Sequence, residues 1–190
     1  MKESPGAGGV NGATIKLEKN GTLTLFLGSP NCGQSHETTT AQVAADILGI
    51  DPERVSTSTP FDSDLAPWGV AAANSGNNFH LYDIGAVHGA ASKLKEKILA
   101  LAAHVLNAKA EDLTINSGVV QAAGSPLKKI TFADLGKIAY GNQALMPKGF
   151  EAGLQTTFYY TFPHAEPNLV PGPEGLVRAH FTFSAGAHVA

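Results

Sequence analysis

Two stretches of the chain share a design that is suited to binding an anion. Each has a loop of small polar residues just before an expected helix, at residues 28–39 and 71–78. A helix N-terminus has unpaired backbone N–H groups and a partial positive charge, and small residues let an anion approach them closely. The chain has only two arginines, Arg54 and Arg178. These loops therefore offer a way to hold phosphate without cationic side chains, although most such loops are only turns and helix caps.

A second chemical possibility is a nucleophilic pair of Cys32 and His36, which lie four residues apart. A cysteine hydrolase would also need an orienting group and an oxyanion site. The favoured interpretation is therefore a small loop residue followed by a polar residue at a helix start. His36-Glu37 also begins like a zinc-protease motif, but Thr40 stands where the second histidine is required, which excludes that motif.

The other candidate metal ligands are not expected to form a site. His80, His88 and His104 fall in one helical region at steps that spread them around its surface. Asp62 and Asp64 could bind a cation, but such a pair beside a proline-containing loop is more typical of a turn. The sequence thus predicts no metal bound directly by protein ligands.

Composition narrows the function classes further. The chain has 190 residues, of which 43% are hydrophobic and only 15% charged, with a net charge of -3. This excludes a disordered tail and argues against nucleic-acid binding. The single Cys32, the absence of a visible signal peptide and the lack of a long apolar run predict a cytoplasmic protein with no membrane span. The low charge predicts a surface covered by a partner, and self-association of the isolated chain.

The pattern of elements predicts an α+β fold, a mixed or antiparallel sheet with helices packed on it. Residues 1–12 are expected to be a flexible lead-in, and residues 13–190 a single domain. Asn20-Gly21 predicts a hairpin turn, and Gly49 the end of a helix. The expected strands cover residues 14–18, 22–27, 54–59, 113–123 (a hairpin), 153–162 and 176–190, and the expected helices cover 38–48, about 79–107 and 131–140.

The segment Gly-Gln-Ser-His-Glu-Thr-Thr at residues 33–39 resembles a cofactor loop of the molybdenum-binding large subunits of the xanthine dehydrogenase and aldehyde oxidase family. Carbon monoxide dehydrogenase-like large chains are the most similar type. Asp-Ser-Asp-Leu-Ala-Pro-Trp-Gly at 62–69 and Phe-Ser-Ala-Gly-Ala-His-Val at 183–189 continue the resemblance, which extends from about residue 13 to residue 190. The chain would be roughly a quarter of a complete large subunit.

The resemblance implies a molybdopterin cofactor with molybdenum, in its cytosine dinucleotide form. The complete enzyme would hydroxylate an aldehyde, heterocycle or similar carbon centre with oxygen from water, and pass electrons to iron–sulfur and flavin partners. The residues that would hold the cofactor are Gly33, Gln34, Ser35, His36 and Thr38, with Ser75 and Gly76 as a second contact. Gln34 would hydrogen-bond near the molybdenum oxygens.

Several departures from the family pattern support an alternative. The family usually has glutamine at the position of Cys32 and glycine at that of Ser35, and its second loop carries an arginine that residues 74–78 lack. A preceding glycine-rich loop and the later segment with a catalytic glutamate are also absent. The alternative is a non-catalytic scaffold or interaction domain that keeps the fold. No residue is a credible catalytic base, so we expect no turnover from the isolated chain.

Overall fold

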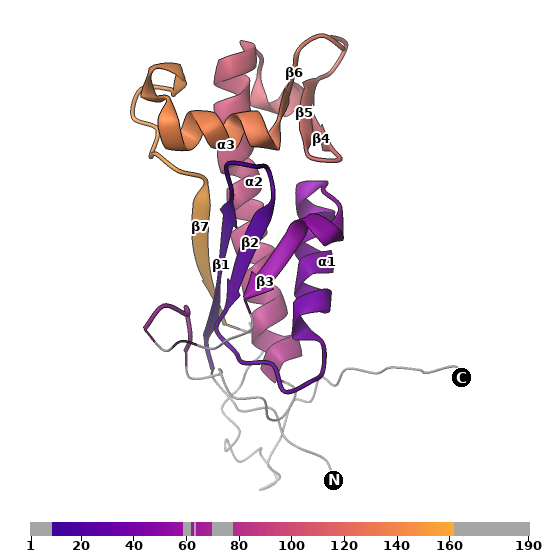
Figure 1. Ribbon diagram of the computed structural model, residues 1–190, viewed down its shortest axis with the longest axis vertical. Coiled ribbons are helices and arrows are strands. Elements are labelled where there is room, and N and C mark those ends of the chain that lie inside the picture. The colour runs from indigo at the N-terminus through magenta and orange to yellow at the C-terminus, as the bar shows by residue number, and fades with distance from the viewer. Residues whose placement is uncertain (1–8, 59–61, 63, 70–77, 162–190) are drawn as a thin grey trace, which may run out of the picture.

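The computed structural model describes residues 9–58, 62, 64–69 and 78–161. A four-stranded sheet lies against two long helices, and a smaller unit of three strands and a helix sits at one end of them (Figure 1). The α+β class predicted from the sequence is confirmed. The expected strand at 176–190 and the second-loop residues Ser75 and Gly76 lie outside the described residues.

The four-stranded sheet has the order β3-β2-β1-β7 and is mixed. Its strands are β1 (Asn11–Leu17), β2 (Leu23–Leu27), β3 (Val55–Ser58) and β7 (Gln155–Tyr160). β1 pairs antiparallel with both β2 and β7, whereas β2 and β3 run parallel. The predicted hairpin is confirmed, and Gly21 takes the positive φ of 83° that its turn requires. β1 begins at Asn11, inside the segment expected as a lead-in.

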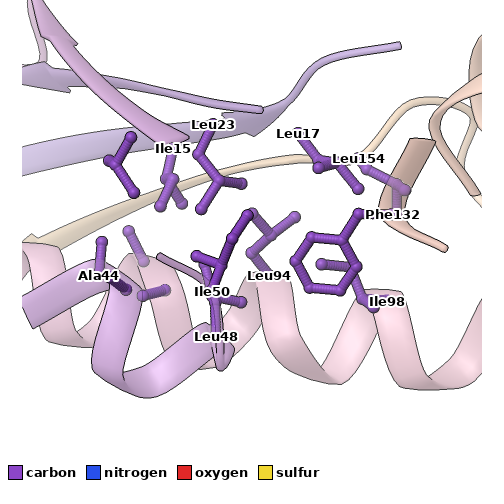
Figure 2. Packing of buried hydrophobic residues seen from close by; sticks show 14 of the residues in the cluster. Ile15, Leu17, Leu23, Ala44, Leu48, Ile50, Leu94, Ile98, Phe132 and Leu154 are labelled. Carbon is purple, nitrogen blue, oxygen red and sulfur yellow. The ribbon is translucent and has the colours of Figure 1, made fainter. Parts of the chain in front are cut away.

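Helices α1 (His36–Leu48) and α2 (Ile84–Leu106) cover one face of this sheet (Figure 1). The core lies between the sheet and these two helices (Figure 2). Alternate residues of the strands, such as Ile15 and Leu23, meet the apolar stripe of α2, including Leu94 and Ile98. Gly49 ends α1 in the left-handed conformation, as predicted. A π-helical turn, Phe79–Asp83, leads directly into α2.

Two glycines let α2 approach β7 very closely. A Cβ atom at Gly85 would lie 2.3 Å from the Tyr160 ring, and one at Gly89 would lie 2.2 Å from the Phe158 ring. The Thr156 hydroxyl donates a 2.7 Å hydrogen bond to the Ala90 carbonyl in the same contact. The alternation along β7 therefore points Thr156, Phe158 and Tyr160 at the helix.

The smaller unit follows the C-terminal end of α2. The antiparallel strands β4 (Leu113–Asn116), β5 (Val119–Ala122) and β6 (Lys129–Thr131) precede α3 (Phe132–Gly141). The capping box predicted at Thr131 is confirmed, because its hydroxyl accepts a 3.1 Å hydrogen bond from Asp134 N. Single 3-10 turns cover Pro52–Arg54, Ala110–Asp112 and Gln143–Leu145. Among the described residues, none of the helices combines the length and apolar character of a membrane-spanning segment.

The close contact between α2 and β7 gives a first prediction. Gly89→Ala should lower the free energy of unfolding by about 1–3 kcal/mol, because its methyl group must displace the Phe158 ring. Gly141→Ala in α3 is the control, since a Cβ there meets nothing within 4 Å, and it should be neutral or stabilising by up to about 1 kcal/mol. Urea unfolding of both variants measures the difference. Equal stabilities of the two variants would contradict the packing argument.

Candidate functional site

The loop between β2 and α1, residues 28–35, lies at the end of the fold where α2 begins (Figure 1). Cys32, Gly33, Gln34 and Ser35 are all exposed there, and Thr38 is exposed in the first turn of α1. The structure thus brings four of the predicted cofactor-binding residues (Gly33, Gln34, Ser35 and Thr38) onto one exposed surface.

Asn31 organises the loop from within. Its side-chain oxygen accepts hydrogen bonds from the backbone N–H groups of Gly33 at 3.0 Å and Gln34 at 3.2 Å, and its amide group donates to Glu37. The Gln34 side chain folds back so that its oxygen accepts from Cys32 N at 2.7 Å. The loop therefore has a defined shape even though its residues are small and exposed.

Ser35 forms the N-cap of α1 in the left-handed conformation, with φ 58° and ψ 42°, and its side chain makes no capping hydrogen bond. The first N–H groups of α1 thus have no side-chain cap at this position, which suits them to meet an acceptor from outside the helix. Glu37 lies in the first turn, where its charge complements the helix dipole. The arrangement favours an anionic ligand that is held by backbone donors.

His36 does not join this exposed surface. Its ring is 4% exposed and stacks on Phe79, with ring centroids 3.5 Å apart and planes within 4°. Burial lowers the pKa of His36 below its usual value, so the ring is neutral at physiological pH. The exposed Cys32 and the buried His36 are therefore poorly arranged for nucleophilic catalysis. His36 Nδ1 and the Asn78 side-chain oxygen are both buried without a hydrogen-bond partner.

Behind the loop lies a buried polar cluster that the sequence did not reveal, formed by Asn11, Ser29 and Asp83. The Asn11 amide donates to Ser29 Oγ at 2.8 Å and to Asp83 Oδ1 at 3.0 Å. Ser29 Oγ donates in turn to Asp83 Oδ2 at 3.0 Å, and Asn11 Oδ1 accepts from Gly69 N at 3.1 Å. Asp83 and Asn11 are completely buried. The cluster joins four segments of the chain, from β1, the loop after β2, residues 66–69 and the π-turn.

Glycines bring these segments close together. A Cβ at Gly28 would lie 2.1 Å from Asn11 Oδ1, one at Gly12 would lie 2.3 Å from the Pro67 carbonyl, and one at Gly69 would lie 2.2 Å from the Val10 carbonyl. Any side chain at these three positions would push the segments apart. The small residues are therefore required by close backbone packing around the cluster.

The remaining candidates do not form a site. In the described ranges, no group of three or more histidine, cysteine, aspartate or glutamate residues is placed to hold a metal ion. Asp62 is a turn residue, because its side chain accepts from Asp64 N at 2.9 Å and its carbonyl from Ala66 N at 2.7 Å. Two surface hollows that share Tyr140, Ala152 and Gly153 lie beside α3 and β7, and neither is lined by a residue of the loop.

Asp83 gives a prediction about pH. Burial raises its pKa from 3.8 to about 6, against the opposing effect of its hydrogen bonds with Asn11 and Ser29. Because the folded protein holds this proton more tightly than the unfolded chain, the stabilising effect of protonation is complete below about pH 4. It is lost as the pH rises through about 6, at a cost of about 3 kcal/mol.

Asp83→Asn removes the titration, so its free energy of unfolding should not follow this step. At pH 7.5 the variant should be more stable than the wild type by about 2 kcal/mol, after about 1 kcal/mol is lost with the Ser29 hydrogen bond. Urea unfolding of both proteins at pH 4, 5.5 and 7.5 measures the change. Parallel pH profiles for the two proteins would show that the carboxyl does not titrate as inferred.

The strained backbone of Ser35 gives another prediction. A residue with a Cβ atom is less stable by about 1 kcal/mol in the left-handed region, which glycine adopts without steric strain. Ser35→Gly should therefore raise the free energy of unfolding by up to about 1 kcal/mol, with the greater freedom of glycine in the unfolded chain offsetting part of the gain. Ser125→Gly, in the turn between β5 and β6 where Ser125 has no positive φ, is the control and should be neutral or destabilising. The free energy of unfolding of each variant is compared with that of the wild type. An equal change in Ser35→Gly and Ser125→Gly would contradict the assigned strain.

Comparison with known proteins identifies the family. The family model described as "Molybdopterin cofactor-binding domain" matches residues 2–190. The large subunit of nicotine 6-hydroxylase from Paenarthrobacter nicotinovorans is 33% identical over 146 residues, which are 76% of this chain and 17% of that protein. The carbon monoxide dehydrogenase large chain from Afipia carboxidovorans is 31% identical over 152 residues, covering 80% of this chain and 18% of the relative.

Solved structures agree. Quinoline 2-oxidoreductase from Pseudomonas putida 86 superimposes with a TM-score of 0.70 at 34% identity, over 80% of this chain and 19% of that chain. Reconstituted CO dehydrogenase from Oligotropha carboxidovorans gives the same TM-score at 29% identity, over 83% of this chain and 19% of that chain. The chain thus spans less than a fifth of the length of these relatives, somewhat less than the quarter expected.

These matches confirm the resemblance seen in the sequence, and they do not favour the scaffold alternative. They support molybdopterin with molybdenum as the cofactor type. The two curated relatives are named as a large subunit and a large chain. The chain belongs to the molybdopterin cofactor-binding domain family of the molybdenum hydroxylase-type oxidoreductases.

Proposed function

We propose that residues 33–38 hold the molybdopterin cofactor through the loop and the N-terminus of α1. The observation that carries this proposal is the exposed, internally hydrogen-bonded loop that ends at the uncapped first turn of α1. Backbone N–H groups there would meet the negatively charged groups of the cofactor. Gly33, Gln34, Ser35 and Thr38 would lie nearest to it, with His36 supporting the loop from behind.

The residues fit such a group on two counts. A Cβ at Gly33 would meet nothing within 4 Å, so there is open space beside the loop for a ligand. His36 Nδ1 and the Asn78 side-chain oxygen are buried polar atoms without partners where α1 and the π-turn meet, and such atoms are rare unless water or a ligand completes them. Ser75 and Gly76 remain predicted as a second contact.

When bound, the cofactor supplies the redox chemistry of the molybdenum centre. The part of this chain is to bind and orient it, with the Gln34 amide as a side-chain hydrogen-bonding group beside the backbone donors. The proposal extends to the cytosine dinucleotide form and to a complete enzyme that hydroxylates an aldehyde, heterocycle or similar carbon centre. Four further points also stay predictions: iron–sulfur and flavin partners, a cytoplasmic location, self-association of the isolated chain, and its lack of turnover.

Gly33→Ala tests the loop against a matched control. Both Gly33 and Gly124 have positive φ, 93° and 70°, and a Cβ at either would meet nothing within 4 Å. Alanine should therefore strain the backbone equally, by about 1 kcal/mol, in both places. Only Gly33→Ala should also reduce bound cofactor, by about tenfold, because of these two glycines only Gly33 lies in the proposed cofactor loop.

The measurement is molybdenum by elemental analysis and pterin by fluorescence after oxidation, per polypeptide. The enzyme that contains this chain is purified for it from a molybdate-supplied host. Full cofactor content in Gly33→Ala, or equal losses in both variants, would count against the loop as the binding element. A wild-type enzyme with neither molybdenum nor pterin would overturn the proposed function itself.

A further inference from the structure

Both ends of the loop are fastened to the same short element, the π-turn Phe79–Asp83. At the start of the loop, Ser29 Oγ donates to Asp83 Oδ2 at 3.0 Å. Just after its end, His36 stacks on Phe79 at 3.5 Å. The first and last residues of the π-turn thus hold the two ends of the loop, and π-turns of this kind are frequent at functional sites.

The contacts at both points are buried. Ser29 is 5% exposed, His36 is 4% exposed and Asp83 is fully buried. By contrast, the residues of the loop between these points are exposed from Cys32 to Ser35. The exposed part therefore lies between two buried contacts with the π-turn, and these contacts set its position relative to α2.

We propose that the π-turn is the positioning element of the cofactor loop, with Asp83 fixing the start of the loop through Ser29 and Asn11, and Phe79 fixing its end through His36. This inference rests on the proposed function. Neither Asp83 nor Phe79 is assigned a contact with the cofactor. They act through the loop, so they are positioning residues and not catalytic ones.

The chemistry at Asp83 is specific to a carboxylate. Its two oxygens accept one hydrogen bond each, from the amide of Asn11 and the hydroxyl of Ser29. An asparagine there keeps the shape but offers a single acceptor, so the Ser29 hydroxyl keeps the Asn11 donor and loses its acceptor. The groups that face Asp83 from β1 and from the loop, Asn11 and Ser29, are uncharged. The neighbouring Tyr82 in the π-turn accepts from Gly9 N at 3.2 Å.

Among the described residues no cation pairs with Asp83, and an unpaired ionised carboxylate is costly to bury, yet it is the form that accepts both bonds. The raised pKa of Asp83 reflects that cost. The stability of the fold therefore favours an uncharged residue at this position, whereas the fixed position of the loop requires the carboxylate. A variant that removes the charge should gain stability and at the same time lose the fixed loop, which a purely structural residue would not do.

The test uses the enzyme that contains this chain, purified with its cofactor. Asp83→Asn and Phe79→Leu are compared with Thr156→Val, which removes the hydrogen bond between β7 and Ala90 in a contact away from the loop. The measurements are molybdenum and pterin per polypeptide, the rate of pterin loss from pH 5 to 8, and the thermal unfolding midpoint.

For Asp83→Asn we expect an unfolding midpoint at pH 7.5 equal to or above that of the wild type, together with pterin loss at least about tenfold faster. In the wild type the loss should accelerate as the pH falls through about 6, because protonation removes an acceptor from Ser29. In Asp83→Asn it should not depend on this step. Phe79→Leu should accelerate the loss, whereas Thr156→Val should lower the midpoint and leave retention unchanged.

Wild-type retention of pterin in Asp83→Asn and Phe79→Leu would overturn the positioning role and leave the proposed function intact. The positioning role would also be overturned if pterin loss followed the unfolding midpoint in all three variants, Thr156→Val included. Such a result would show that pterin loss depends only on the overall stability of the protein. A wild-type enzyme that carries no molybdenum or pterin would overturn both proposals.

Discussion

The burial of one carboxylate, Asp83, constrains the whole end of the fold that carries the loop. Its oxygens accept from Asn11 and Ser29, and Asn11 in turn accepts from the backbone of Gly69. Segments that are far apart in sequence meet at this group, and their backbones approach so closely that only glycine fits at several positions. Moving the carboxylate would leave the amide and hydroxyl donors unpaired in a dry environment. The loop, β1 and the start of α2 are therefore joined by one hydrogen-bonded cluster.

Local signals in the sequence predicted much of the fold. The turn at Gly21, the end of α1 at Gly49 and the cap at Thr131 each depend on residues within four positions of one another, so their pattern is visible along the chain. Asp83 was missed because its partners lie 72 and 54 residues away. One signal was present, because Asp83 precedes the buried Val87 by four residues and thus falls on the apolar stripe of α2.

The predicted site divides in a similar way. The exposed loop followed from its small residues and its place before a helix, and the structure explains why the family pattern has glycine at the position of Ser35. Ser35 occupies a left-handed backbone position, which is the position at which glycine is favoured. The burial of His36 was not predictable, because Phe79, which covers its ring, is 43 positions further along the chain. No local pattern of polar and apolar residues indicates a contact at that separation.

The order in which the chain leaves the ribosome gives the pairing of β1 with β7 a further consequence. Thr14 lies opposite Thr157, so one side of β1 has no partner strand until almost the whole described part of the chain has been synthesised. Contacts of such long sequence separation form slowly, and an unpaired strand edge invites pairing with other chains. Until residues 155–160 emerge, the nascent protein exposes an open edge of its four-stranded sheet, and Gly85 and Gly89 of α2 lack the rings of Tyr160 and Phe158 that later pack on them. Completion of this sheet therefore waits for the synthesis of residues 155–160, and until then the open edge of β1 is the part of the sheet that a chaperone would protect.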